Sequence, residues 1–118
     1  MTNDIKVAIS AANKFHRAIK KSFKVGNIPY ECKNMLDLTY SLSFLKAIKR
    51  RNESKINMLE NGFVHECSKI DFAYSRFKNQ IESDENLFYA LAEYRDSIGW
   101  LMKIIQMREI SKEIKRFL

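Results

Sequence analysis

Residues that break helices are scarce in this chain, and that scarcity limits its fold more than any other feature. The 118 residues include three Gly and one Pro. A sheet of short strands needs turn residues about every ten positions, and no segment here alternates apolar and polar residues for long enough. The sequence therefore predicts an all-α fold with one domain, residues 1–118, an up-down-up-down four-helix bundle. The expected helices span about residues 4–24, 31–51, 54–82 and 84–118.

The first predicted helix has one apolar face and one cationic face. Its apolar residues are three or four positions apart, the spacing of an amphipathic helix that packs on a core: Ile5, Ala8, Ala12, Phe15 and Ile19. The opposite face carries what we call the N-terminal cationic row: Lys14, Arg17, Lys20, Lys21 and Lys24. Such a row is either a solvated face or a track for phosphate groups.

The second predicted helix carries two apolar rows where one would be enough for a bundle core. The first row is Met35, Leu38, Leu42 and Leu45, and the second is Leu36, Tyr40, Phe44 and Ile48. Two rows indicate either the most buried helix or a helix that also contacts a sister subunit, since four large side chains in contact contribute several kcal/mol. We predict that the second row lines an oligomer interface.

Cations follow these rows and form what we call the Lys46–Lys55 cluster: Lys46, Lys49, Arg50, Arg51 and Lys55. Cations at the end of a helix also suit its dipole, so this cluster has a purely structural explanation as well.

The boundary between the second and third predicted helices involves alternatives. Asn52 or Ser54 can cap a third helix, whose apolar spacing then continues through Asn61-Gly62; the other reading ends the second helix at that pair. Ser83 is expected to cap the last helix. Within that helix, Gly99 indicates either close approach by a neighbouring backbone or simple tolerance. Beyond Ile105 the apolar spacing shifts, so the last residues are expected to overhang the bundle, with no role assigned to 106–118.

The chain lacks the residue sets that catalysis, metals or cofactors require. Cys32 and Cys67 form no C-x-x-C pair and are expected to be reduced core thiols. His65 and Cys67 are two positions apart, which directs them to different helix faces and opposes a zinc site. No nucleophile-base set, phosphate loop or di-iron motif is present, so we expect no enzyme, no metal and no cofactor.

Hydrophobic runs and the N-terminus predict a soluble cytoplasmic protein without a membrane span. No uncharged run approaches the ~20 apolar residues that a spanning helix needs. The first ten residues lack the cationic and apolar regions of a signal peptide.

Charge is concentrated in the first half of the chain. The formal net charge is +7; residues 1–55 hold twelve Lys or Arg against four acids, a net +8, and residues 56–118 hold nine against ten, a net −1. This asymmetry favours an anionic partner, most often nucleic acid. The alternative is a solvated, Lys-rich surface.

The order of helices, an Ile28-Pro29 pair between the first two, and the segment "AYSRFK" resemble the accessory variability determinant proteins that accompany reverse transcriptases. The related proteins encoded as intervening sequences in bacterial ribosomal RNA genes share this pattern. Arg76 matches an Arg of the family's third helix, and Ile98-Gly99 with Trp100 approximates a pair that precedes a Trp in the fourth. The family places further residues between that pair and the Trp, whereas here Trp100 follows Gly99 directly. The resemblance implies a homo-oligomer, often a pentamer, that binds nucleic acid and a reverse transcriptase.

The leading functional prediction is a non-catalytic module that binds RNA or DNA through the phosphate backbone, without sequence preference. The N-terminal cationic row and the Lys46–Lys55 cluster are the candidate contacts. Two other classes remain open: an immunity or anti-defence protein that acts on another protein or an anionic membrane surface, and a structural assembly subunit.

Overall fold

The computed structural model describes the backbone of residues 2–117 and the side chains of residues 3–108. Within the described part the chain is helical and contains no strand, which confirms the predicted all-α class. The helices are α1 (Thr2–Lys24), α2 (Tyr30–Met35), α3 (Thr39–Lys49), α4 (Glu53–Arg76), α5 (Lys78–Ser83) and α6 (Glu85–Phe117). The predicted second and third helices are each divided in two.

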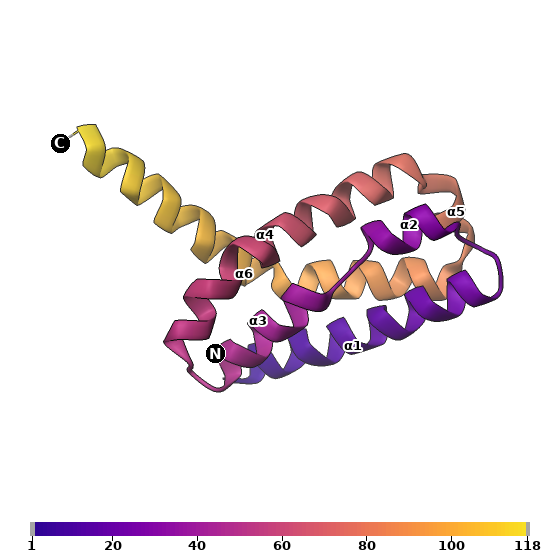
Figure 1. Cartoon of the computed structure of the whole chain (residues 1–118), viewed down its shortest axis with the longest axis horizontal. Helices are drawn as coiled ribbons and strands as arrows, with labels where there is room; N and C mark the ends of the chain where they lie inside the picture. Colours follow the sequence, from indigo (N-terminus) through magenta and orange to yellow (C-terminus); the bar gives the residue numbers. More distant parts are fainter. Residues whose placement is uncertain (1, 118) are drawn as a thin grey trace.

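The helices form a bundle in which α4 and α6 approach each other less closely than the other neighbouring helices do. The long helix α1 packs along α6 and along α3, while α2 and α3 pack on α4 (Figure 1). The short helix α5 joins α4 to α6. Apart from this link, no described Cα atom of α4 lies within 8 Å of one of α6. The α4–α6 side therefore depends on side-chain contacts alone.

Aromatic pairs connect the helices inside the bundle. Phe15 of α1 stacks on Tyr94 of α6 with ring centroids 5.6 Å apart. Phe44 of α3 stacks on Phe63 of α4 at 4.7 Å. All four side chains are buried, so each pair removes a large apolar area from water where two helices meet.

The break between α2 and α3 is a local turn completed by a distant carboxylate. Asp37 accepts hydrogen bonds from the backbone N–H of Thr39, at 3.1 Å, and from its hydroxyl, at 2.7 Å. Leu38, the N-cap residue of α3, cannot cap with its aliphatic side chain. Glu66 of α4, only 3% exposed, replaces it. Its carboxylate accepts from the N–H groups of Tyr40, at 3.1 Å, and Ser41, at 2.7 Å, and from the Ser41 hydroxyl, at 2.7 Å.

The chain reverses after α1 and after α3 with the same pair of hydrogen bonds. After α1, the N–H of Gly26 bonds the carbonyl of Phe23, and the N–H of Asn27 bonds that of Ser22. After α3, Arg51 bonds Ile48 and Asn52 bonds Ala47 in the same way. This is the Schellman motif, whose turning residue is left-handed and usually Gly. Gly26 has φ 82°, but the second turn places Arg51 there, at φ 55°.

The third predicted helix begins where its cap predicts. The Asn52 side chain accepts from the N–H of Lys55 at 3.2 Å, and α4 runs on through Asn61-Gly62. Gly62 allows close packing, since a Cβ atom there would lie 2.9 Å from Cγ of Tyr40. The helix ends at Arg76 rather than at residue 82, and α5 follows after Phe77.

For the last helix, the predicted Ser83 cap is wrong, and of the two readings of Gly99 the structure agrees with simple tolerance. The N-cap is Asp84, whose carboxylate accepts from the N–H of Leu87 at 3.1 Å; the Ser83 hydroxyl instead donates to the Asn79 carbonyl. A Cβ atom on Gly99 would meet nothing within 4 Å, so no backbone approaches it closely. The last part of the α6 ribbon extends beyond the bundle, as expected (Figure 1). Leu118 and the side chains of 109–117 lie outside the described residues, and with them much of the 106–118 segment.

Candidate nucleic-acid interface

Most of the N-terminal cationic row lies on the outer face of α1, because the core residues of that helix occupy its opposite face. All five members are exposed. Lys14 differs from the other four, since its ammonium group lies 3.4 Å from the Glu93 carboxylate of α6. Lys14 therefore has a carboxylate partner within the bundle, which makes it the weakest candidate of the row.

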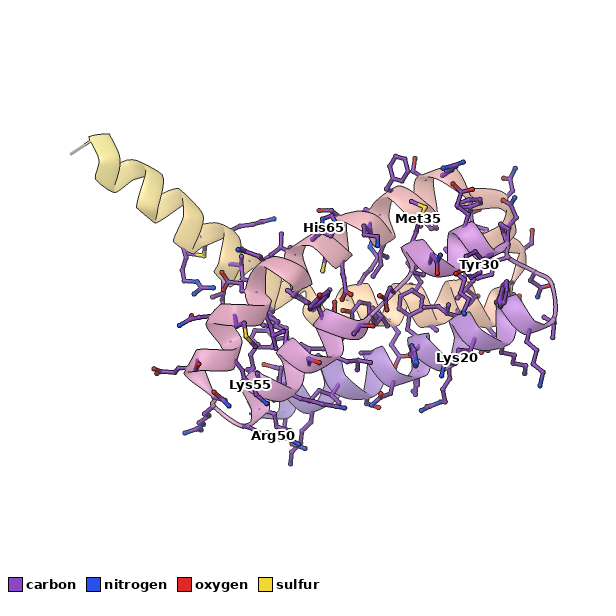
Figure 2. All side chains as sticks on the ribbon, in the orientation of Figure 1. Lys20, Tyr30, Met35, Arg50, Lys55 and His65 are labelled. Atoms are coloured by element: carbon purple, nitrogen blue, oxygen red, sulfur yellow. The ribbon has the colours of Figure 1, made fainter. Side chains whose placement is uncertain are left out.

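The Lys46–Lys55 cluster surrounds the turn between α3 and α4. Lys46 and Lys49 occupy the last turn of α3, where the helix dipole favours cations. Arg50 and Arg51 form the turn, and Lys55 lies in the first turn of α4. Figure 2 shows the labelled Arg50 and Lys20 projecting from the same lower edge of the molecule.

A hollow between α1 and α3 brings the two cationic groups together. It has a volume of about 330 Å³ and is lined by Arg17 of the row and Lys49 of the cluster, with Lys6, Ile9, Ser10 and Asn13. The fold joins them within one chain.

Lys6 is a candidate that the sequence prediction missed. It lies eleven residues before Arg17, three helical turns away, and therefore on the same face of α1. Extending the row by its own period toward the N-terminus would have found it.

Ion pairs are rarer in the two groups than among the cations of the second half of the chain. Apart from Lys14, no member of the row or the cluster forms an ion pair within 4.0 Å with a side chain of residues 3–108. In the second half of the chain, by contrast, four of the six described cations pair with carboxylates, and Lys69 and Lys103 do not. These pairs are Arg76–Glu31 at 2.7 Å, Lys78–Glu82 at 4.0 Å, Arg95–Asp71 at 3.0 Å, and Arg108–Glu60.

Most residues of the predicted oligomer interface are buried, fully or partly, within the chain itself. Leu36 and Phe44 are each 1% exposed and belong to the core of the chain itself, and Ile48 packs partly against that core. Only Tyr40 is open to solvent, at 53%. The break at residues 36–38 removes the continuous helix on which these four residues would share one outer face.

The cysteines and histidines form no reactive set in the described residues. Burial raises the pKa of Cys32 to about 11, and burial with the nearby Asp71 and Glu66 carboxylates raises that of Cys67 to about 12. Both thiols are therefore protonated near neutral pH and weak as nucleophiles or ligands. Among the described side chains, no three His, Cys, Asp or Glu residues are placed to hold a metal ion.

In the described part of the chain, no helix is both long and apolar enough to cross a membrane. Comparisons with protein-family models, with curated proteins and with solved structures found no match for this chain.

Proposed function

We propose that this chain is a non-catalytic, basic bundle of up-down-up-down topology that binds nucleic acid through its phosphate backbone. The observation that carries the proposal is the hollow between α1 and α3, which is lined by Arg17, Lys49 and Lys6, none of which has a carboxylate partner among the described side chains. Cations that already pair with carboxylates of the same chain gain little from contact with an external polyanion. Unpartnered cations gathered on one face favour an external polyanion.

The chemistry of this face favours RNA or DNA of any sequence. Each phosphate that a Lys or Arg neutralises releases condensed counterions, and this release supplies affinity without reading bases. Lys side chains dominate the two groups and act as flexible point charges, which suits phosphates at variable positions.

The family resemblance adds further parts to the proposal. In that context the protein is a cytoplasmic, homo-oligomeric accessory factor of a reverse transcriptase. With the predicted interface row lying largely in the core, the oligomer would need another surface. The nucleic-acid proposal stands on the monomer and does not depend on these parts.

Two matched triple variants test the function. The first, Lys49→Ser with Arg50→Ser and Arg51→Ser, removes unpartnered cations around the α3–α4 turn. The second, Arg76→Ser with Lys78→Ser and Arg95→Ser, removes the same charge from residues that have carboxylate partners. Fluorescence anisotropy with a short single-stranded RNA and a short DNA duplex measures affinity at one fixed salt concentration. Circular dichroism checks that both variants remain helical.

We expect the first variant to bind both probes about a hundredfold more weakly and the second to bind nearly as the parent does. Equal losses in the two variants would show that overall charge acts rather than this face. Unchanged binding in the first variant would mean that Lys49, Arg50 and Arg51 of the parent form only a solvated helix end and contact no phosphate. Failure of the parent to bind either probe would favour the alternative of a protein or membrane partner.

A further inference from the structure

A second hollow lies at the end of the bundle where α6 leaves it. Its volume is about 550 Å³, within the ~300–1,000 Å³ of small-molecule sites. Four helices contribute apolar side chains to its wall: Ile5 of α1, Phe44 and Ile48 of α3, Ile56 of α4, and Trp100 and Ile104 of α6. The indole N–H of Trp100 already donates to the Ser97 carbonyl at 2.9 Å, so the ring presents apolar surface to the cavity.

The charged residues of the cavity are mostly cations. Lys49 and Arg51 line it without an ion-pair partner in residues 3–108, while Arg108 pairs with Glu60, the only acid among the described lining residues. An apolar wall beside two unpartnered cations is complementary to a molecule with an apolar chain and one anionic group.

The backbone at Arg51 supports this reading. Its φ of 55° lies in the left-handed region, which is unfavourable for a residue with a side chain because the Cβ atom crowds the following carbonyl oxygen. Gly would turn the chain here without that cost, as Gly26 does after α1. A strained Arg at the wall of a cavity is the kind of exception that binding sites retain.

We propose that this cavity binds a single-chain amphiphilic anion, an alkyl carboxylate such as decanoate. The alkyl chain lies against Phe44, Ile56 and Trp100, and the carboxylate contacts Lys49 and Arg51. Since these two cations also belong to the proposed nucleic-acid interface, an occupied cavity weakens nucleic-acid binding.

Trp100 makes a direct test possible, because it is the only Trp of the chain. Decanoate carrying bromine near the chain end quenches Trp fluorescence on contact, and the titration is done below the concentration at which micelles form. We expect saturable quenching, with competition by unlabelled decanoate. Decanol and decyltrimethylammonium should compete at least tenfold more weakly, because they lack the anion.

Two exposed lysines provide a matched pair of variants. Lys49→Gln should weaken decanoate about tenfold and leave decanol unchanged, whereas Lys103→Gln, on α6 outside the cavity lining, should change neither. Both positions are exposed, so folding is retained.

Three outcomes would overturn the proposal: no quenching of Trp100, equal competition by decanol and decanoate, or equal behaviour of the two variants. Binding to phosphatidylglycerol vesicles without any response to free decanoate would also overturn it, in favour of a membrane surface. The titration contains no nucleic acid, so its failure and the failure of the proposed function are separate results.

Discussion

The α1–α3 face and the α4–α6 side of this bundle differ in how their cations pair with carboxylates. On the α4–α6 side, Arg95 and Arg108 of α6 pair with carboxylates of α4. On the α1–α3 face, Arg17 and Lys49 share a hollow with no such partner among the described side chains. Both sides are rich in Lys and Arg, so cation content alone does not identify an interface. The two sides differ instead in how many of their cations have a carboxylate partner among the described side chains.

The two sides also differ in how closely their helices approach. Tyr40 of α3 lies directly against Gly62 of α4, so those two backbones are close. Between α4 and α6 there is a cavity of about 230 Å³, lined in part by Cys67, Tyr94 and Met102. Close packing therefore holds α3 and its cations in position, while ion pairs bridge the looser side.

The largest effect should come from the carboxylate that attaches α3 to α4. Glu66→Ala removes three hydrogen bonds and leaves the buried N–H of Ser41 and the part-buried N–H of Tyr40 without this acceptor. We expect a loss of about 3 kcal/mol in the free energy of unfolding, measured by urea denaturation. Glu93→Ala, which removes only an exposed ion pair, should cost less than about 1 kcal/mol. Similar costs for the two would mean that Glu66 does not position α3.

Substitutions of Gly62 and Gly99 compare a closely packed position, where α3 contacts α4, with an open position on α6. Gly62→Ala places a Cβ atom 2.9 Å from Cγ and 3.1 Å from Cβ of Tyr40, so α3 and α4 must separate slightly. We expect a net loss of about 1–2 kcal/mol, even though Ala favours a helix. Gly99→Ala meets nothing within 4 Å and should stabilise the chain by up to about 1 kcal/mol. Thermal denaturation of both proteins measures this difference, and stabilisation by Gly62→Ala would contradict the close α3–α4 packing.

Substitutions of the neighbouring Arg50 and Arg51 separate the effect of losing a positive charge from the effect of relieving backbone strain. Arg51→Gly removes a cation and relieves a left-handed backbone, so stability should rise by about 1 kcal/mol while nucleic-acid affinity falls several-fold. Arg50→Gly removes the same charge from a residue with φ −85° and should lower stability by about 0.5 kcal/mol, with a similar loss of affinity. Denaturation and anisotropy on both variants make the comparison. If Arg51→Gly bound more tightly than the parent, Arg51 would have no role in the interface.

The sequence predicted what depends on nearby residues. The apolar spacing of Ile5 to Ile19 identified α1 and its buried face, and Asn52 identified the start of α4, because caps and helix faces involve residues within a few positions. The break at Leu36–Leu38 was not predictable in this way, since the acceptor that completes it is Glu66, more than twenty-five residues further on. Without that break, Leu36 and Phe44 were assigned to an outer face.

The candidate interface follows the same rule. Each cationic group was visible as a periodic or contiguous pattern, but the hollow that joins Arg17 to Lys49 exists only because α3 packs on α1. The pairing of Arg95 with Asp71 is equally tertiary. The net charge of each half of the chain indicated that a cationic interface would lie in the first half. It could not show which cations have carboxylate partners.

The salt dependence of duplex DNA binding tests the central claim most directly. If the α1–α3 face binds phosphates, the logarithm of the parent's affinity should fall linearly and steeply with the logarithm of the salt concentration. Loss of three contacts in the variant with Lys49→Ser, Arg50→Ser and Arg51→Ser should flatten the slope by about 2.7, since each duplex phosphate contact contributes about 0.9. The variant with Arg76→Ser, Lys78→Ser and Arg95→Ser should keep the parent's slope. A parent whose affinity barely changes with salt, or equal slopes in the parent and the first variant, would contradict the account.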